Sequence, residues 1–277
     1  MTIDAVTEWW GTFDLDEGRG GRWDIGPCTL WLYRAAQEWR VLARSSPDHL
    51  ASGSAVEVPL PEDAMADVLA ADDPAITIQR HSFRQTEAGL ALHPALADRP
   101  VIVRPEDPLY IPSQEEVTLY VSTPLWVQVE VRDAPRRLAD LPTYRASDTW
   151  FGPSTREGEL CYAARTSGRS RLENLPLRMH RAVTPLAVRN RASDALLLER
   201  VQIPTPYLPL YCSPDHYLWT PAVTLSRTEG AEGATVDIKR GAPREIQNPR
   251  RVREPREEPR AGLVVSTFKA LGALFGH

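Results

Sequence analysis

Regular alternation of side-chain type is the feature that most constrains the fold of this chain. The clearest example is a segment in which Leu125, Val127, Val129 and Val131 alternate with Trp126, Gln128, Glu130 and Arg132. The same period of two residues runs through 29–34 and 196–203. This period is that of a β-strand, and it predicts sheets with one buried and one solvated face.

Proline content supports an all-β fold. The chain has 277 residues and 25 prolines, which disfavour long helices and suit many strands joined by rigid turns. The segment 133–145 is interpreted as a linker, and the strand–polar turn–strand pattern around 186–203 is common in Ig-like sandwiches. We therefore predict two antiparallel β-sandwich-like (Ig-like) domains at 1–134 and 135–240, a disordered basic tether at 241–260 and an amphipathic helix at 261–277.

The tether prediction depends on the run from Lys239 to Arg260, which is rich in Pro, Arg and Glu. It has eight basic and four acidic residues in a chain of net charge −5, so the rest of the chain is acidic. Such a composition buries little apolar surface and predicts a solvated, disordered segment. Because the chain as a whole is not basic, we expect no nucleic-acid partner.

An apolar segment, AGLVVSTFKALGALFGH, follows the tether. If this segment forms an α-helix, with 100° of rotation per residue, its apolar side chains gather on one side. The candidate docking residues on that face are Val264, Phe268, Leu271, Leu274 and Phe275. Three interpretations are open: the helix folds back on the body, docks in a partner protein, or lies on a membrane with the basic tether over anionic lipid. We favour docking in a protein partner, and a membrane protein is one such partner. The long polar connection argues against the fold-back interpretation, because a core element rarely needs one.

The segment 147–163 holds a polar cluster around Trp150. Its candidate binding residues on the body are Asp148, Trp150, Arg156 and Glu159. If Asp148 and Glu159 faced each other, the two carboxyl groups could perform general acid–base chemistry. The simpler interpretation is a structured loop in which Trp150 packs underneath. We assign no catalytic residue.

Two other groups of residues contain side chains that can bind metals or sugars. Cys212 and His216 stand four apart, but a metal site needs three or four converging ligands, so we expect a turn with a buried cysteine and a surface histidine. No metal or other cofactor is expected. The N-terminal tryptophans form either a sugar-stacking platform or, as we favour, part of the core: Trp9, Trp10, Trp23, Trp31 and Trp39.

Targeting signals and cysteine usage indicate a compartment. The N-terminus lacks a basic region followed by an apolar one, and no apolar run approaches the roughly 18 residues of a spanning helix. Three widely spaced cysteines suit reduced thiols. We therefore expect a cytoplasmic protein, peripheral to the inner membrane if the tail binds there.

Two stretches carry a family resemblance: SDTWFGPSTREGELCYA and RAVTPLAVRNRASDALLLERVQIPTPYLPLY. They are similar to an uncharacterised prokaryotic domain-of-unknown-function family, over residues 8–238. The resemblance implies a β-rich, soluble protein without assigned activity, linked to small-conductance mechanosensitive channels. It brings no functional residues with it.

Our leading prediction of function is a non-enzymatic accessory or adaptor protein, whose β body binds a partner or ligand and whose tail docks to a second protein or to the inner membrane surface. The alternatives are a hydrolase-type enzyme with its site at 148–161 and a carbohydrate-binding module that uses the N-terminal tryptophans.

Overall fold

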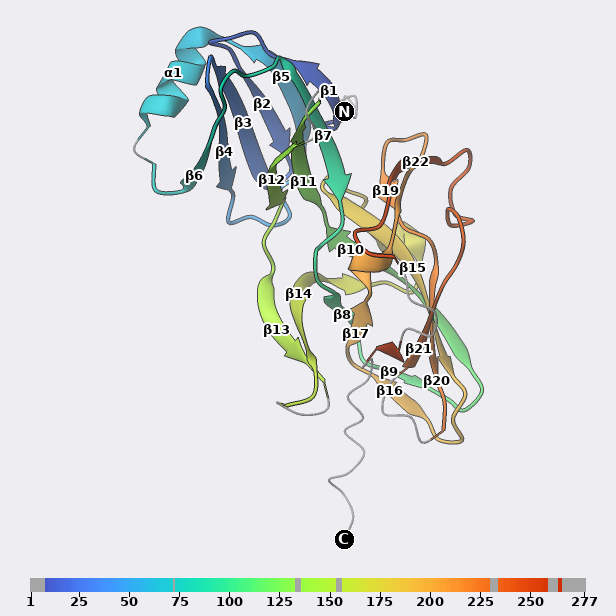
Figure 1. The fold of residues 1–277 in the computed structure, drawn as a ribbon. Coiled ribbons are helices and arrows are strands. Elements are labelled where there is room, and N and C mark those ends of the chain that lie inside the picture. The colour runs from blue at the N-terminus through green and yellow to red at the C-terminus, as the bar shows by residue number, and fades with distance from the viewer. Residues whose placement is uncertain are drawn as a thin grey trace. The chain divides into compact units, whose positions relative to one another are not determined.

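The computed structural model describes residues 8–71, 73–132, 136–152, 156–229 and 234–258, and the backbone of 264–265. It confirms a β-rich protein: strands dominate the described residues, and α1 (Glu62–Ala70) is the one α-helix among them (Figure 1). Short 3₁₀ turns occur at Leu172–Asn174 and Thr205–Tyr207. In the part of the chain described, no helix has the length and apolar character to cross a bilayer.

The chain divides into two compact units. The first contains Met1–Ala95, Leu125–Arg145 and Arg178–His180, and the second contains Leu96–Pro124, Ala146–Leu177 and Arg181–His277. The chain therefore passes between the units several times. The boundary expected at residue 134 does not coincide with this division.

A five-stranded antiparallel meander sheet forms much of the first unit. Its strand order is β5 (Ser54–Leu60), β2 (Gly20–Ile25), β3 (Cys28–Ala35), β4 (Glu38–Ser45) and β6 (Ile76–Ser82). Tight turns connect β2 to β3 and β3 to β4, so these strands pair with their neighbours in sequence. The strand predicted at 29–34 is confirmed.

Helix α1 covers apolar side chains of this sheet. Its sequence starts with Glu62 and Asp63 directly after Pro61, which suits the positive end of a helix dipole. Met65 is the buried residue of α1, and it packs in a cluster with Trp31 and Leu42 of the sheet. Helix α1 thus adds its apolar side chains to the core cluster on this sheet.

The segment 125–132 lies in the second sheet of the first unit, where side chains on both of its faces are buried, whereas one solvated face was expected. Its antiparallel order is β1 (Gly11–Asp14), β7 (Gly89–Ala95), β11 (Trp126–Val131) and β12 (Arg136–Pro142). The valines are buried as predicted, but Trp126 and Gln128 on the opposite face are buried too. Gln128 tolerates burial because its Nε2 donates to Asp140 Oδ2 at 3.0 Å.

The largest sheet lies in the second unit. Its order is β22 (Arg250–Arg253), β18 (Leu210–Cys212), β19 (Leu218–Trp219), β15 (Arg181–Asn190), β20 (Val223–Arg227), β21 (Ala234–Ile238) and β23 (Val264–Val265), with β10 (Glu116–Pro124) also paired to β15. The ladders of β15 with β19 and with β20 are parallel. Parallel pairs need long crossovers, so the antiparallel sandwich predicted from local patterns is wrong for this sheet.

Two smaller sheets complete the second unit. One has the order β13 (Ser147–Phe151), β14 (Glu159–Gly168), β8 (Val101–Pro105) and β17 (Val201–Ile203), with β14 and β8 parallel; the other pairs β9 (Leu109–Ile111) with β16 (Leu196–Leu198). The predicted pairing of 186–188 with 196–203 is therefore wrong, because β16 and β17 pair with β9 and β8 instead.

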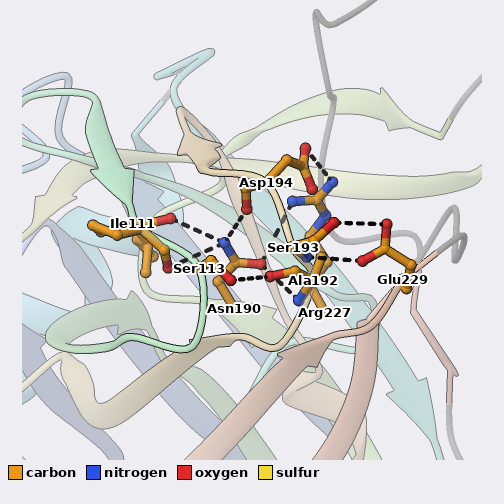
Figure 2. Close-up of polar contacts among 9 residues, drawn as sticks. Ile111, Ser113, Asn190, Ala192, Ser193, Asp194, Arg227 and Glu229 are labelled. Carbon is orange, nitrogen blue, oxygen red and sulfur yellow. Dashed lines mark hydrogen bonds and ion pairs between the residues drawn. The ribbon is translucent and has the colours of Figure 1, made fainter.

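A buried asparagine holds the turn that follows β15 (Figure 2). The Nδ2 atom of Asn190 donates to the backbone oxygens of Ile111, Pro112 and Asp194, at 3.0, 3.2 and 2.6 Å. Arg227 Nη2 reaches Asp194 Oδ2 at 3.0 Å, and this hydrogen bond lowers the pKa of Asp194. Because the amide of Asn190 is fully used in holding the chain, we assign this network a structural role.

The predicted disordered tether is wrong over 241–258, which we call the strap. Its β22 pairs antiparallel with β18, and the Glu257 backbone N–H donates to the Pro206 carbonyl at 3.0 Å. Arg256 Nε donates to the Leu96 carbonyl at 2.6 Å, and Ile246 packs on a cluster that contains Trp219. Backbone pairing and one apolar anchor thus order a segment whose composition alone indicates disorder.

Candidate functional site

The residues predicted as a body site lie on the hairpin of β13 and β14, at one edge of its sheet (Figure 1). In the hairpin register Asp148 is opposite Tyr162, Trp150 is opposite Leu160, and Phe151 is opposite Glu159. Side chains alternate between the two faces of a strand. Asp148 and Trp150 therefore share one face, which we call the outer face, and Glu159 lies on the other, inner face.

Trp150 and Leu160 form an exposed apolar pair on the outer face. Their exposed fractions are 46% and 42%. A Cβ added to Gly158 would meet Trp150 Nε1 at 2.6 Å, so the indole lies directly against the glycine backbone. The absence of a side chain at Gly158 thus allows the ring to lie there with one part still open to solvent, and the expected packing of Trp150 beneath the loop is wrong.

Charged and aromatic groups border this pair. Asp148 Oδ1 is 3.3 Å from Arg99 Nη1, and the guanidinium of Arg99 lies 5.4 Å from the ring centroid of Tyr162. The Tyr162 hydroxyl donates to Asp98 Oδ1 at 3.0 Å. The outer face therefore has an apolar centre with a charged border, the pattern common in protein–protein contacts.

The inner face of the hairpin is partly buried, and Glu159 is among its exposed residues. Phe151 and Cys161 are buried there, and Glu159 Oε2 accepts from Gln202 Nε2 at 2.7 Å. Burial, with the charge of Glu159, raises the pKa of Cys161 to about 12, so its thiol is not a nucleophile at neutral pH. Because Asp148 and Glu159 lie on opposite faces, they do not form the carboxylate pair that the hydrolase alternative needs. Arg156 is exposed in the connection between the strands.

The burial of the N-terminal tryptophans contradicts the sugar-stacking alternative. All eight tryptophans lie in the described residues, and Trp150 is the one that is exposed. The rings of Trp9 and Trp10 meet edge to face, with an interplanar angle of 88°. A stacking platform needs exposed, coplanar rings, so the N-terminal tryptophans belong to the core, as favoured from the sequence.

The Cys212–His216 segment is a turn, as expected. Cys212 is buried in β18, and His216 lies in the connection to β19, where its backbone N–H donates to the Ser213 carbonyl at 2.9 Å. His216 has φ 65°, and it is half-buried rather than at the surface.

The tail residues divide between the described and the undescribed chain. Val264 and Val265 form β23, which pairs antiparallel with Ala234 and Thr235 of β21. At Val264, therefore, the structure has a strand where a helix was expected. The other proposed docking residues, Phe268, Leu271, Leu274 and Phe275, lie outside the described residues.

A cleft of about 290 Å³ in the second unit was missed from the sequence. Residues of β10 and β15 line it together with strap residues, and the strap contributes Ala242, Pro243, Arg244 and Glu245. The one feature of the sequence that could have indicated this cleft is Glu245 beside the isolated apolar residue Ile246. Nothing in the pattern indicated that these two residues return to β10 and β15.

Comparison with known proteins gives a family and no activity. No curated protein and no solved structure matches the chain. A family model described as "Protein of unknown function (DUF432)" matches residues 9–272. The match covers nearly the whole chain, including the β13–β14 hairpin and the strap. The chain therefore belongs to the DUF432 family of proteins of unknown function.

Proposed function

We propose that the chain is a non-enzymatic accessory or adaptor protein whose β-rich body binds a partner protein through the outer face of the β13–β14 hairpin. In this proposal the C-terminal segment docks to a second protein or to the inner membrane surface. The protein works in the cytoplasm, in contact with a membrane protein such as the channels implied by the family resemblance.

The observation that carries the proposal is the exposed pair of Trp150 and Leu160. Seven of the eight tryptophans are buried, and the exception lies beside an exposed leucine on an edge hairpin. Tryptophan is enriched among the residues that dominate binding energy at protein interfaces. Its ring lies on Gly158, which reduces the side-chain entropy lost on binding.

The tail contributes a second contact in this proposal. An amphipathic helix that includes Phe268, Leu271, Leu274 and Phe275 would present its apolar face to a groove or to a bilayer. Val264 and Val265 pair with β21 of the second unit, so a helix that follows them would dock close to that unit.

The test is affinity capture from cell lysate that includes the detergent-solubilised membrane fraction. The bait is the full chain, compared with the double variant Trp150→Ser/Leu160→Ser. The matched control is Tyr110→Ser, because Tyr110 of β9 is 73% exposed and belongs to another sheet. We expect a partner that the control retains and the hairpin variant loses. Equal recovery by both variants would overturn the role of the hairpin.

A second arm tests the tail. The chain is ended after Glu258 rather than after Lys239, so that the strap is preserved. A partner or membrane fraction lost on this truncation, and kept by the hairpin variant, supports separate docking by the tail. Recovery unchanged by the truncation removes the tail from the proposal.

A further inference from the structure

The largest sheet of the second unit has a hollow on one face. Across the β10–β15 ladder Thr118 is opposite Ala187 and Tyr120 is opposite Pro185, so all four side chains lie on the same face. Leu119 and Leu186 point to the other face, which is buried core. The small side chains of Thr118, Pro185 and Ala187 line the sheet side of the cleft together with Glu116, and strap residues line its other side.

One buried carboxylate of the strap is only half satisfied. The side chain of Glu245 is 11% exposed, and its Oε1 accepts from the Tyr120 hydroxyl at 3.3 Å. Its Oε2 is buried without a hydrogen-bond partner among the described residues. A buried oxygen without a donor is costly, which makes Glu245 a site for an incoming donor.

Tyr120 holds this carboxylate in place. Burial, and then the charge of Glu245, raises the pKa of Tyr120, so that its hydroxyl is protonated and available to donate at neutral pH. The remaining motion of the Glu245 carboxyl is rotation about its last side-chain bond, a broad and soft torsion. That rotation would turn an oxygen toward a group in the cleft.

Groups of both charges line the cleft. Lys239 and Arg244 are cationic, and Glu116 and Glu245 are anionic. Lys239 Nζ contacts Asp237 Oδ2 at 2.6 Å, and the Arg244 side chain, 90% exposed, has its Nε 3.8 Å from Glu245 Oε1. Glu116 is already paired with Arg189, so Glu245 is the carboxylate of the cleft lining that attracts an ammonium group. Lys239 and Arg244 repel a ligand that carries only positive charge, and Glu245 repels one that carries only negative charge. A ligand with both charges would be attracted by Glu245 and by the two cations.

From the cleft we propose that this protein binds a small zwitterion carrying an amine and a carboxylate, the chemistry of an amino acid. Its ammonium donates to Glu245, and its carboxylate meets Lys239 and Arg244. Its carbon chain lies on Pro185 and Ala187. The volume of about 290 Å³ lies at the low end of the range of small-molecule pockets, which suits a single small molecule rather than a polypeptide.

The binding test uses four-carbon probes that differ in charge: 2-aminobutyrate, γ-aminobutyrate, butylamine and butyrate. Calorimetry on the full chain measures Kd for each. We expect at least one aminobutyrate to bind at least tenfold more tightly than butylamine and butyrate. Butylamine binding equal to that of the aminobutyrates would overturn the zwitterion in favour of a simple cation. Absence of binding by all four would overturn the site.

Variants locate the binding. Glu245→Gln and Lys239→Met should each weaken aminobutyrate binding about tenfold or more. Glu254→Gln is the matched control, because Glu254 is an exposed strap carboxylate that does not line the cleft. Unchanged Kd in both cleft variants would place the ligand elsewhere and overturn the assignment.

A second measurement does not depend on the variants folding. Trypsin cleaves after Arg244, whose exposed side chain is accessible in the free protein. An aminobutyrate in the cleft bridges the strap to the sheet, so it should slow this cleavage in the unmodified chain about threefold or more. Butylamine and butyrate should leave the rate unchanged. Cleavage at the same rate with every probe would contradict the proposal.

Discussion

The outer face of the β13–β14 hairpin and the cleft under the strap belong to the same unit, yet they are opposite kinds of surface. The hairpin exposes Trp150 and Leu160 to solvent, whereas the cleft encloses Glu245. An exposed apolar pair gains free energy from any large surface that covers it. An enclosed carboxylate gains only from a donor that fits beside it. The two sites therefore suit a macromolecular partner and a small ligand, respectively.

They also differ in what holds them together. The hairpin arises from two strands joined by a short connection, with a register set locally. The cleft exists because the strap returns to β10: Tyr120 and Glu245 are 125 residues apart in the chain. Perturbing the strap should therefore change the cleft and leave the hairpin intact.

Removal of the strap should have the largest effect on stability. A chain ended at Lys239 loses the β22–β18 ladder and uncovers Trp219 beside Ile246. We expect it to be destabilised by about 4 kcal/mol from lost apolar burial and hydrogen bonds. Its melting temperature should fall by roughly 10 °C. A chain ended at Glu258 is the control, and equal melting of the two would remove the structural role of the strap.

A single apolar contact should account for part of that loss. Ile246 is half-buried against a cluster that contains Leu175, Val183 and Trp219. Ile246→Ala should cost about 1–2 kcal/mol, below the usual cost of a fully buried isoleucine. Urea unfolding measures the change, and Val252→Ala on the same strap serves as a comparison. A cost near zero would mean that backbone pairing alone orders the strap.

The Tyr120–Glu245 hydrogen bond should contribute less. Tyr120→Phe removes the donor to Oε1 and should cost about 1 kcal/mol. The double variant with Glu245→Ala should cost less than the sum of the two single variants, because each single variant removes the same contact. Additive costs, measured by urea unfolding, would show that the two side chains do not interact.

The sequence predicted the regions whose partners are near in the chain. In β2, β3 and β4 a period of two residues and tight turns were sufficient, because each strand pairs with the next one. The prediction for the strap was wrong because the partners of the strap are distant in the chain. Composition estimates how much apolar surface a segment buries, whereas the strap is held by backbone pairing to β18, by Ile246 and by Arg256. No local pattern contains that information.

The hairpin is an intermediate case. Its strands and its Trp150 were visible in the sequence, but the partner of each residue was not. Once Trp150 pairs with Leu160, alternation places Asp148 and Glu159 on opposite faces. A shift of one residue in register would have brought them to one face. The failure of the hydrolase alternative thus depends on the register of the hairpin, which the pattern of residue types did not specify.

Replacement of Trp150 should separate binding from stability. Because the ring is exposed, Trp150→Ala should change the free energy of unfolding by no more than about 0.5 kcal/mol. Affinity for the captured partner should nevertheless fall at least about tenfold. Trp219→Ala, at a buried position, is the matched comparison and should cost about 3–5 kcal/mol. A Trp150 variant as unstable as the Trp219 variant would make the ring part of the core.

The smallest effect is expected at Cys161, on the inner face of the same hairpin. Burial raises the pKa of its thiol to about 12, so roughly one molecule in ten thousand carries the thiolate at pH 8. We expect no alkylation of Cys161 by iodoacetamide in the native chain over an hour, followed by complete alkylation in urea, as mapped by mass spectrometry. Trp150→Ala should leave this protection unchanged, because the two side chains lie on opposite faces. Rapid native alkylation would mean that the inner face opens readily. The outer face would then lack the fixed Trp150 ring that distinguishes it, as a docking surface, from the enclosed cleft.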